Sequence, residues 1–341
     1  MLAAKKARRG KRDRGAVRRF EFAMEPALLR LARELEGGAY VPGSFMTHRI
    51  TRPKPRLISA APFRDRVVHH ALMNILEPIF ERRFHPDSYA CRRGKGTHAA
   101  VDRLQGWMRR RPFFMQFDIR QFFPSIDHEI LKAKLARVVG DERVLAVLGR
   151  IIDGSNPQDQ VVDWFDGDTL FTPATRRRGV PIGNLTSQWL ANLYLDDLDH
   201  LVTSGLGYGA YVRYCDDFVV LGTNRDELRA VADSVRHRLA LDRLRCHEDR
   251  LQVHAVDRGL RFLGYRVWST HRVLPNENVR QMRRRVRWMQ RVYAEHRLDW
   301  PEVKQRLASW VGHAGQADSR LLVRRCLHEW VFSRSANMGL A

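Results

Sequence analysis

Cysteine is scarce in this chain of 341 residues. The four cysteines lie far apart with no Cys-x-x-Cys pair, so we expect reduced, cytosolic thiols, not a disulfide framework or a zinc site. The 14 histidines are scattered, and the adjacent pair His69–His70 does not fit the helical spacing of two metal ligands. The cysteines are Cys91, Cys215, Cys246 and Cys326.

Long apolar runs are also missing. None approaches the roughly 20 residues that a membrane-spanning helix needs, and the basic start of the chain lacks the apolar core of a signal peptide. We therefore expect no membrane partner. The glycine-containing loop 92–98 lacks the Gly-x4-Gly-Lys-Ser/Thr spacing of a phosphate-binding loop.

Acidic residues are outnumbered by basic ones. The chain has 60 Lys and Arg against 38 Asp and Glu, which gives a net charge of +22. The excess is mostly arginine, which forks onto phosphates and stacks on bases, so a nucleic-acid partner is expected. Residues 1–19 are especially basic. They are expected to form a flexible or induced-fit arm for nucleic acid, or otherwise a solvated tail.

One pair of acids stands out against this background. Asp216 and Asp217 lie between two short runs of β-branched and aromatic residues, which predicts a β-hairpin with carboxylates at its bend. Aspartate at a bend is common by itself, but Asp118 ends a second apolar strand. If these strands pair, Asp118 and Asp216 converge, and carboxylates that close stay ionised only with a cation between them. Mg²⁺ and a phosphate ester fit such a site.

The remaining pattern predicts an α+β fold. Strands and helices do not alternate regularly, so a mostly antiparallel sheet backed by helices is expected. The basic segment 48–58 is expected to be extended because each proline biases its predecessor toward β, and 260–267 is β-like. Apolar periodicity predicts helices over 20–38, 65–84, 98–111, 128–152, 187–202 and 225–241, and from 278 onward.

Four ordered segments resemble motifs of the reverse transcriptase family. They are Phe117–Asp127, Gly179–Leu195, the Tyr-x-Asp-Asp box Tyr214–Asp217, and Phe262–Tyr265. The resemblance implies a right-hand polymerase fold with fingers, an antiparallel palm sheet and a helical thumb. The expected division is a basic arm over 1–19, fingers over 20–117, palm over 118–268 with a fingers-like insertion at about 140–178, and a basic thumb over 269–341.

Within that family, the chain is most similar to the enzymes of diversity-generating retroelements. The similarity rests on Lys54–Ile58, Asp87–His98, Ile182–Gln188 and Ser309–Ala314. Group II intron proteins more often have Pro-Gln-Gly in place of Pro181-Ile-Gly183, and the segment after Tyr265 leaves room only for a thumb. The late Val-Thr-Gly triplet of retron enzymes is missing.

The resemblance implies RNA-directed DNA synthesis in a bacterial or phage context, in the cytoplasm. The implied partners are a structured template RNA, the cDNA or primer, dNTPs and a small helical accessory protein that forms an oligomeric ring. A retron-like or antiphage-defence reverse transcriptase is the first alternative. A nucleic-acid-binding module without catalysis is the second, although intact acids at 118, 216 and 217 argue against it.

The resemblance also assigns the catalytic roles. Asp118 and Asp216 would hold two Mg²⁺ ions, with Mn²⁺ as a possible substitute, while Asp217 supports them and Ile119 lends a backbone carbonyl. Such a metal pair clamps the attacking 3′-oxygen and the leaving pyrophosphate. Asp127 is expected to cap the helix that starts near His128 and not to bind metal.

Further residues are assigned to the substrates. Phe123 is expected to block a ribose 2′-hydroxyl, although an aromatic there also suits the core. Arg56, helped by Lys54 or Arg49, would contact the triphosphate, with solvated surface charge as the alternative for those two helpers. Gln188 and Asn192 are expected near the template. Arg280, Arg284, Arg287 and Arg291 recur at helical spacing and would grip the primer–template backbone, or else form a solvated face.

Ile182 carries a prediction about fidelity. Many relatives place a glutamine here that hydrogen-bonds near the incoming nucleotide, whereas this chain has an apolar side chain. Losing one such bond is worth about 0.5–1.5 kcal/mol. The resemblance implies misincorporation opposite template adenines.

Overall fold

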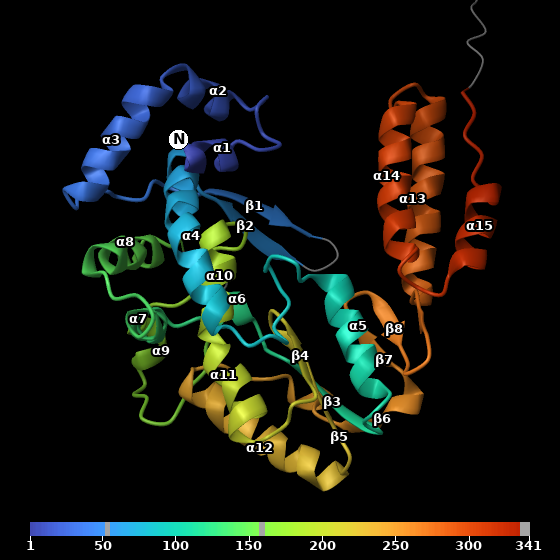
Figure 1. Cartoon of the computed structure of the whole chain (residues 1–341). Helices are drawn as coiled ribbons and strands as arrows, with labels where there is room; N and C mark the ends of the chain where they lie inside the picture. The colour runs from blue at the N-terminus through green and yellow to red at the C-terminus, as the bar shows by residue number, and fades with distance from the viewer. Residues whose placement is uncertain (52–54, 157–160, 335–341) are drawn as a thin grey trace, which may run out of the picture.

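The structure is a computed structural model that describes residues 1–51, 55–156 and 161–334. Its centre is a four-stranded antiparallel sheet in the order β4-β5-β3-β6 (Figure 1). The strands are β3 (Phe113–Asp118), β4 (Tyr211–Tyr214), β5 (Asp217–Gly222) and β6 (Val253–Ala255). The prediction of an antiparallel sheet backed by helices in an α+β fold is therefore confirmed.

Both faces of this sheet are buried, because side chains alternate along each strand. Phe117 and Phe218 lie opposite each other and stack at 4.7 Å on one face. Phe114 and Val219 join a second core on the other face. The first face packs under α4 (Phe63–Arg83), α10 (Leu185–Tyr194) and α12 (Arg225–Leu241), and the second under α5 (Thr97–Met108) and the C-terminal elements.

The N-terminal helices lie beside one end of α4 (Figure 1). They are α1 (Leu2–Ala7), α2 (Gly15–Phe22) and α3 (Met24–Glu36). The expectation of a flexible arm or a solvated tail is wrong for α1, because this helix packs on α4 and buries Ala3, Ala4 and Ala7. The expected contact of residues 1–19 with nucleic acid stays a prediction. These alanines let two helices approach closely while Lys5 and Lys6 stay on the exposed side. A hairpin of β1 (Met46–Ile50) and β2 (Arg56–Ala60) follows.

Three long helical predictions are broken into shorter helices. Residues 20–38 divide at Ala23, and the stretch 128–152 divides into α7 (His128–Ala136) and α8 (Glu142–Asp153), because Asp141 caps the amides of Arg143 and Val144. The stretch 187–202 becomes α10, α11 (Asp196–His200) and a π-helical turn, η1 (Leu201–Gly205). Short helices α6 (Phe122–Ser125) and α9 (Thr172–Thr175) also belong to this part of the chain.

The C-terminal part places a helical unit beyond a second sheet. Two short 3-10 helices, η2 (Glu248–Arg250) and η3 (Val256–Arg258), flank β6, and β7 (Leu260–Phe262), β8 (Tyr265–Val267) and β9 (Arg272–Val273) form a three-stranded sheet. The single β-like segment expected over 260–267 is thus a hairpin. Helices α13 (Asn276–Ala294), α14 (Trp300–Ala314) and α15 (Arg320–Glu329) stand beside one another across from the β1–β2 hairpin (Figure 1). Within the described ranges, no helix has the length and apolar character to cross a membrane.

Candidate active site at the acidic turn

The acidic hairpin has a two-residue turn. Tyr214 pairs with Asp217, so Cys215 and Asp216 form the bend. Cys215 has a φ of 59°, a left-handed conformation that is uncommon for a residue other than glycine. The Asp216 carbonyl accepts a hydrogen bond of 3.3 Å from the Ile119 amide. The predicted hairpin is confirmed, and its turn is tied directly to the end of β3.

Asp118 and Asp217 are a cross-strand pair. They are Cα partners at the end of β3 and β5, and strand alternation puts them on the face opposite the Phe117–Phe218 stack. Gln116, on the same face, donates a hydrogen bond of 2.9 Å to Oδ1 of Asp217. The structure therefore brings two carboxylates together next to the turn that carries the third.

Burial and nearby carboxylates raise the pKa values of Asp216 and Asp217. Burial, followed by the nearby Asp118 and Asp216 carboxylates, raises the pKa of Asp217 to about 7, although the Gln116 hydrogen bond opposes this. Burial and the Asp118 carboxylate also raise the pKa of Asp216, while the positive charge of Arg56 lowers it. Such a site gains from a bound cation.

Carboxylate oxygens are the ligands that Mg²⁺ prefers, so the donor chemistry fits the expected metal. Asp118 forms an ion pair with Arg250 on η2. The arginine thereby neutralises the charge of one of the three acids. Among the residues that the structure describes, no three His, Cys, Asp or Glu side chains gather closely enough to hold a metal ion. The three acids are thus neighbours along the chain and the sheet, but their carboxyl groups are not arranged as a closed ligand set.

The residues that are predicted to contact the nucleotide or the metal differ in their exposure and in their contacts. Arg56 begins β2, is exposed, and acts electrostatically on Asp216. Lys54 lies outside the described residues. Phe123 is half-buried in α6, beside Phe122 at 5.5 Å, and its carbonyl accepts a 3.0 Å hydrogen bond from Val180. Ile119 is buried. The substrate and metal roles of these residues stay predictions.

The segment around Ile182 is fastened to β2. The Ser59 amide donates a hydrogen bond of 2.9 Å to the Ile182 carbonyl, and the Asn184 side chain bonds the Ser59 carbonyl at 3.0 Å and the Ala61 amide at 3.2 Å. Gly183 has a φ of 115°, and an added Cβ would lie 3.2 Å from the Ile58 side chain. This close approach explains the glycine and places Ile182 beside the strand that begins with Arg56.

Helix α10 carries two residues that were expected near the template. Gln188 is exposed, and its contact with a template strand stays a prediction. The expectation for Asn192 is wrong, because its side chain is buried and bonds the Ala90 carbonyl at 2.8 Å and the Arg213 guanidinium at 3.2 Å. The expected cap is confirmed: Asp127 accepts hydrogen bonds of 3.0 Å from the amides of Glu129 and Ile130.

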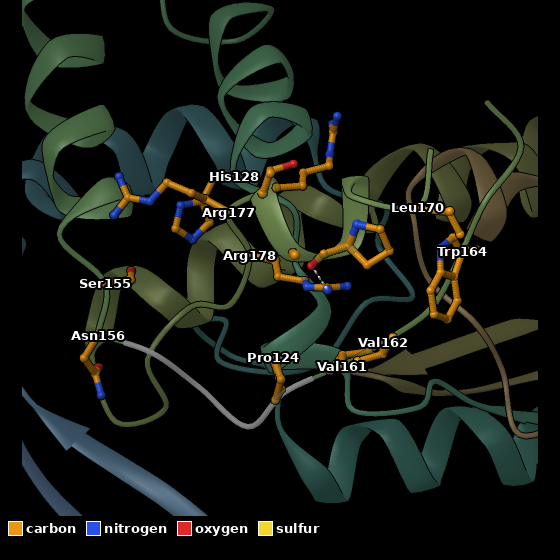
Figure 2. A pocket seen from close by; sticks show the side chains of 14 residues that line it. Pro124, His128, Ser155, Asn156, Val161, Val162, Trp164, Leu170, Arg177 and Arg178 are labelled. Atoms are coloured by element: carbon orange, nitrogen blue, oxygen red, sulfur yellow. Dashed lines mark hydrogen bonds between the residues drawn. The ribbon is translucent and has the colours of Figure 1, made fainter. Parts of the chain in front are cut away.

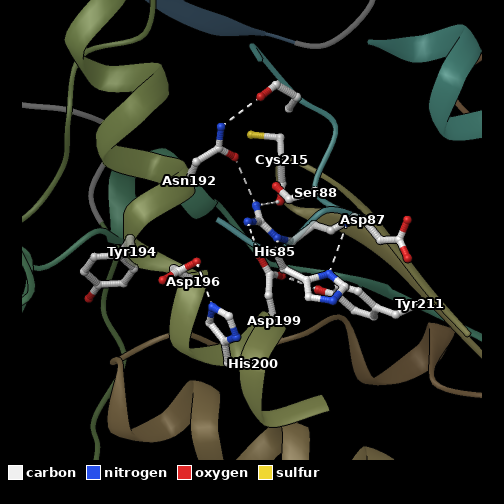
Figure 3. A network of polar contacts seen from close by, with 12 residues as sticks. His85, Asp87, Ser88, Asn192, Tyr194, Asp196, Asp199, His200, Tyr211 and Cys215 are labelled. Carbon is white, nitrogen blue, oxygen red and sulfur yellow. Dashed lines mark hydrogen bonds and ion pairs between the residues drawn. The ribbon is translucent and has the colours of Figure 1, made fainter. Parts of the chain in front are cut away.

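Arg213 and Asp199 are positions that sequence reasoning missed. Both side chains are fully buried and form an ion pair of 2.6 Å, and Figure 3 shows Asp199 among the polar residues near Cys215. The sequence does contain one indication of this pair, because Arg213 is a lone arginine between apolar residues of a strand. Its partner lies 14 residues away on α11, which no local pattern reveals.

A separate cavity of about 610 Å³ lies in the predicted insertion (Figure 2). Its lining includes Pro124, His128, Trp164, Arg177 and Arg178 but none of the three acids. Arg177 bonds the Asp153 carbonyl, and Arg178 bonds the Pro173 carbonyl at 2.5 Å. The cavity is therefore distinct from the acidic turn.

Helix α13 has the predicted two-sided pattern. Met282, Val286 and Met289 are buried in the C-terminal core. The exposed positions include Arg280, Arg284, Arg287 and Arg291. This arrangement leaves a row of arginines facing away from the core, available to a polyanion.

Paired acids at the tip of an antiparallel sheet, backed by helices and flanked by a basic helical unit, define the palm of a template-directed polymerase. The sequence model of the reverse transcriptase (RNA-dependent DNA polymerase) family matches residues 48–267. The chain belongs to the reverse transcriptase family, and its class of enzyme is RNA-directed DNA polymerase.

Individual relatives agree with this assignment. Protein YkfC of Escherichia coli (strain K12) is 27% identical over 290 residues, which cover 72% of this chain and 72% of YkfC. The group II intron-encoded protein LtrA of Lactococcus lactis subsp. cremoris is 24% identical over 181 residues, which cover 52% of this chain and 28% of LtrA. The chain thus spans only about a quarter of the length of LtrA.

The fold is also that of a solved reverse transcriptase. Apo telomerase from Candida tropicalis, truncated from its C-terminal domain, matches with a TM-score of 0.50 and 13% sequence identity. The match covers 68% of this chain and 55% of the telomerase chain. At this identity the likeness shows the fold alone, and it confirms the expected reverse transcriptase fold.

Proposed function

We propose that this chain copies a structured template RNA into cDNA by adding dNTPs to a 3′ end at the acidic turn. The observation that carries the proposal is the pairing of Asp118 with Asp217 beside Asp216, in a chain of the reverse transcriptase family. When bound to these acids, Mg²⁺ ions supply charge neutralisation for the 3′-oxygen and the leaving pyrophosphate.

The chain's own residues supply binding and orientation. Arg56 neutralises the incoming triphosphate from the β1–β2 side, with Lys54 assisting, and Phe123 limits space at the ribose. Gln188 lies along the template. The exposed arginines of α13 bind the primer–template backbone, because guanidinium groups fork onto phosphate oxygens. The rate then depends chiefly on positioning and on charge neutralisation.

A finer proposal concerns the biological role. The apolar Ile182, held against β2 by the Ser59 amide, supports an enzyme that is error-prone at template adenines, as the diversity-generating retroelement resemblance implies. Such an enzyme acts in the cytoplasm of a bacterium with a small helical oligomeric accessory protein. Mutagenic retrohoming into a variable gene is the corresponding role.

An intron-associated role is the second candidate, because LtrA is described as a group II intron-encoded protein. A retron-like or antiphage-defence enzyme is a third. The genes beside this one distinguish them. Template and variable repeats next to a variable-protein gene support the diversifying role, whereas a surrounding intron RNA supports the second candidate.

Extension of a DNA primer on an RNA template tests the activity. We expect incorporation of dNTPs with Mg²⁺, a response to Mn²⁺, and loss of incorporation in Asp216→Asn. Asp141→Asn is a matched control, since Asp141 is an exposed helix cap away from the turn. The assay is run with and without the native RNA and accessory partner. Equal incorporation by Asp216→Asn would contradict the assignment of the site.

A further inference from the structure

Arg213 is a fully buried cation on β4. One further strand residue separates it from the acidic turn. Its Nε and Nη2 atoms donate to the two carboxylate oxygens of Asp199, each at 2.6 Å. Neither side chain is exposed to solvent. The Tyr211 hydroxyl donates a further 2.6 Å hydrogen bond to Asp199 (Figure 3). The carboxylate is therefore held by two residues of β4.

The remaining nitrogen of the guanidinium reaches the turn itself. Nη1 of Arg213 donates a 3.1 Å hydrogen bond to the Cys215 carbonyl and a 3.2 Å bond to the side chain of Asn192. The Asn192 amide is fixed in turn by the Ala90 carbonyl at 2.8 Å. A planar guanidinium with both ends engaged has one available orientation.

The backbone of Arg213 is held as firmly as its side chain. Its amide donates to the Asp87 carbonyl and its carbonyl accepts from the Tyr89 amide, both at 2.9 Å. The segment around Ser88 thereby covers the free edge of β4 as a parallel bridge. Side chain and main chain together fix Arg213 to α10, α11 and the loop before α5.

The contact with the Cys215 carbonyl bears directly on the next residue of the chain, Asp216. The Cys215 carbonyl belongs to the peptide plane whose nitrogen is that of Asp216. Cys215 itself has a φ of 59°, a left-handed conformation that is uncommon for a residue with a side chain. A hydrogen bond that restrains this peptide plane also restrains the backbone from which the Asp216 side chain leaves the turn.

A buried ion pair is not required for stability. Replacing such a pair by apolar residues of similar volume is often neutral or stabilising, because two charges no longer have to be desolvated. Stability alone therefore does not explain why this chain has the buried Arg213–Asp199 pair. A role in orienting the turn does explain it.

We propose that Asp199 and Arg213 are positioning residues that orient Asp216 through the Cys215 carbonyl. The proposal rests on the proposed function of the acidic turn. Neither residue touches substrate; both act by fixing one peptide plane. Tyr211 supports Asp199, and Asn192 supports the guanidinium from α10.

Graded variants separate orientation from stability. Arg213→Lys keeps the charge but loses the fork, so kcat for nucleotide addition is expected to fall at least about tenfold, with KM for dNTP and affinity for RNA within about twofold. Tyr211→Phe removes only the hydroxyl bond to Asp199 and is expected to have a smaller effect. Arg238→Lys is the matched control. Arg238 lies on α12, away from the turn, and its guanidinium also donates two hydrogen bonds to a carboxylate, that of Asp242.

The double variant Asp199→Leu/Arg213→Met is the decisive one. It is expected to retain the melting temperature of the parent and to lose about 100-fold in kcat, which is the scale of effect for a misplaced catalytic group. Normal kcat in this folded double variant would overturn the proposal. Should the double variant not fold, Arg213→Lys decides: a kcat loss no larger than that of Arg238→Lys, at equal melting temperature, overturns it as well.

Terbium binding supplies a readout without turnover. Tb³⁺ luminescence at the acidic turn, identified as the signal that Asp216→Asn removes, is expected to need at least about tenfold more Tb³⁺ in Arg213→Lys. Unchanged Tb³⁺ affinity contradicts the orientation of Asp216 by Arg213. Failure of the unmodified chain to add any nucleotide would contradict the proposed function instead, and the terbium comparison would still test the inference.

Discussion

Asp118 of β3 and Asp217 of β5 are directly opposed across the central sheet. The stacked rings of Phe117 and Phe218 lie in the next position along the same two strands, on the opposite face. The strand register and the adjacent aromatic contact therefore place both acids. The position of these two acids does not depend on a loop. Burial raises the pKa of Asp217, and a nearby cation favours its ionised form.

Removing one of these charges is expected to stop catalysis without unfolding the chain. Asp118→Asn keeps the side-chain shape but lacks the anionic oxygen that a metal requires, so nucleotide addition is expected to fall by at least about 1000-fold. Single-nucleotide extension measures this, with circular dichroism and RNA binding as checks of the fold. Activity within tenfold of the parent would mean that Asp118 is not a metal ligand.

Arg250 is expected to compete with the metal for Asp118. The ion pair joins a half-exposed arginine to a carboxylate that is 21% exposed, so its contribution is modest. Arg250→Gln is expected to tighten Mn²⁺ binding by about twofold to fivefold, which electron paramagnetic resonance titration measures. Arg258→Gln, an exposed neighbour bound to His254, is the control. Weaker Mn²⁺ binding in Arg250→Gln would show that the arginine supports the metal site.

The positions of the three acids could be predicted from sequence because their signals are local. Asp118 ends an apolar strand and Asp216–Asp217 interrupt another, and strand pairing then brings them together by geometry alone. The cap at Asp127 has the same local origin, since a side chain accepts from amides only two and three residues away. A pattern that is confined to one strand or one helical turn involves only neighbouring residues, so it can be recognised without knowledge of the tertiary structure.

The missed features depend on distant partners. The polar group that satisfies Arg213 is supplied by α11, and nothing within β4 identifies it. The N-terminal error has a different cause: Ala4 is buried against α4, but alanine carries little hydrophobic signal among lysines and arginines. The Arg250–Asp118 pair joins segments 132 residues apart and is equally invisible to local patterns.

Ile182 is expected to lower fidelity at template adenines. Its backbone is held by Ser59, so a substitution changes the side chain at a fixed position. Ile182→Gln restores a hydrogen-bonding group and is expected to reduce errors opposite adenine by up to roughly tenfold. Sequencing of cDNA made on a defined RNA measures the error spectrum, with Ile182→Val as the apolar control. Equal adenine errors in Ile182→Gln and Ile182→Val would end this explanation.

His69 is expected to make the fold sensitive to mild acid. It lies on α4, is buried, and burial together with His70 and Arg66 lowers its pKa to about 4. Between about pH 6.5 and 4 the unfolded chain binds a proton that the folded chain does not, so stability falls as pH falls through this window. A shift of this size corresponds to roughly 3 kcal/mol of unfolding free energy.

Urea unfolding at a series of pH values tests this assignment. The parent is expected to lose stability from pH 7 to pH 4, and His69→Leu is expected to lose less by roughly 3 kcal/mol, because leucine cannot take up the proton. Comparing the two slopes cancels the contributions of all other groups that titrate in both proteins. Parallel curves for parent and variant would show that another buried group causes the acid sensitivity.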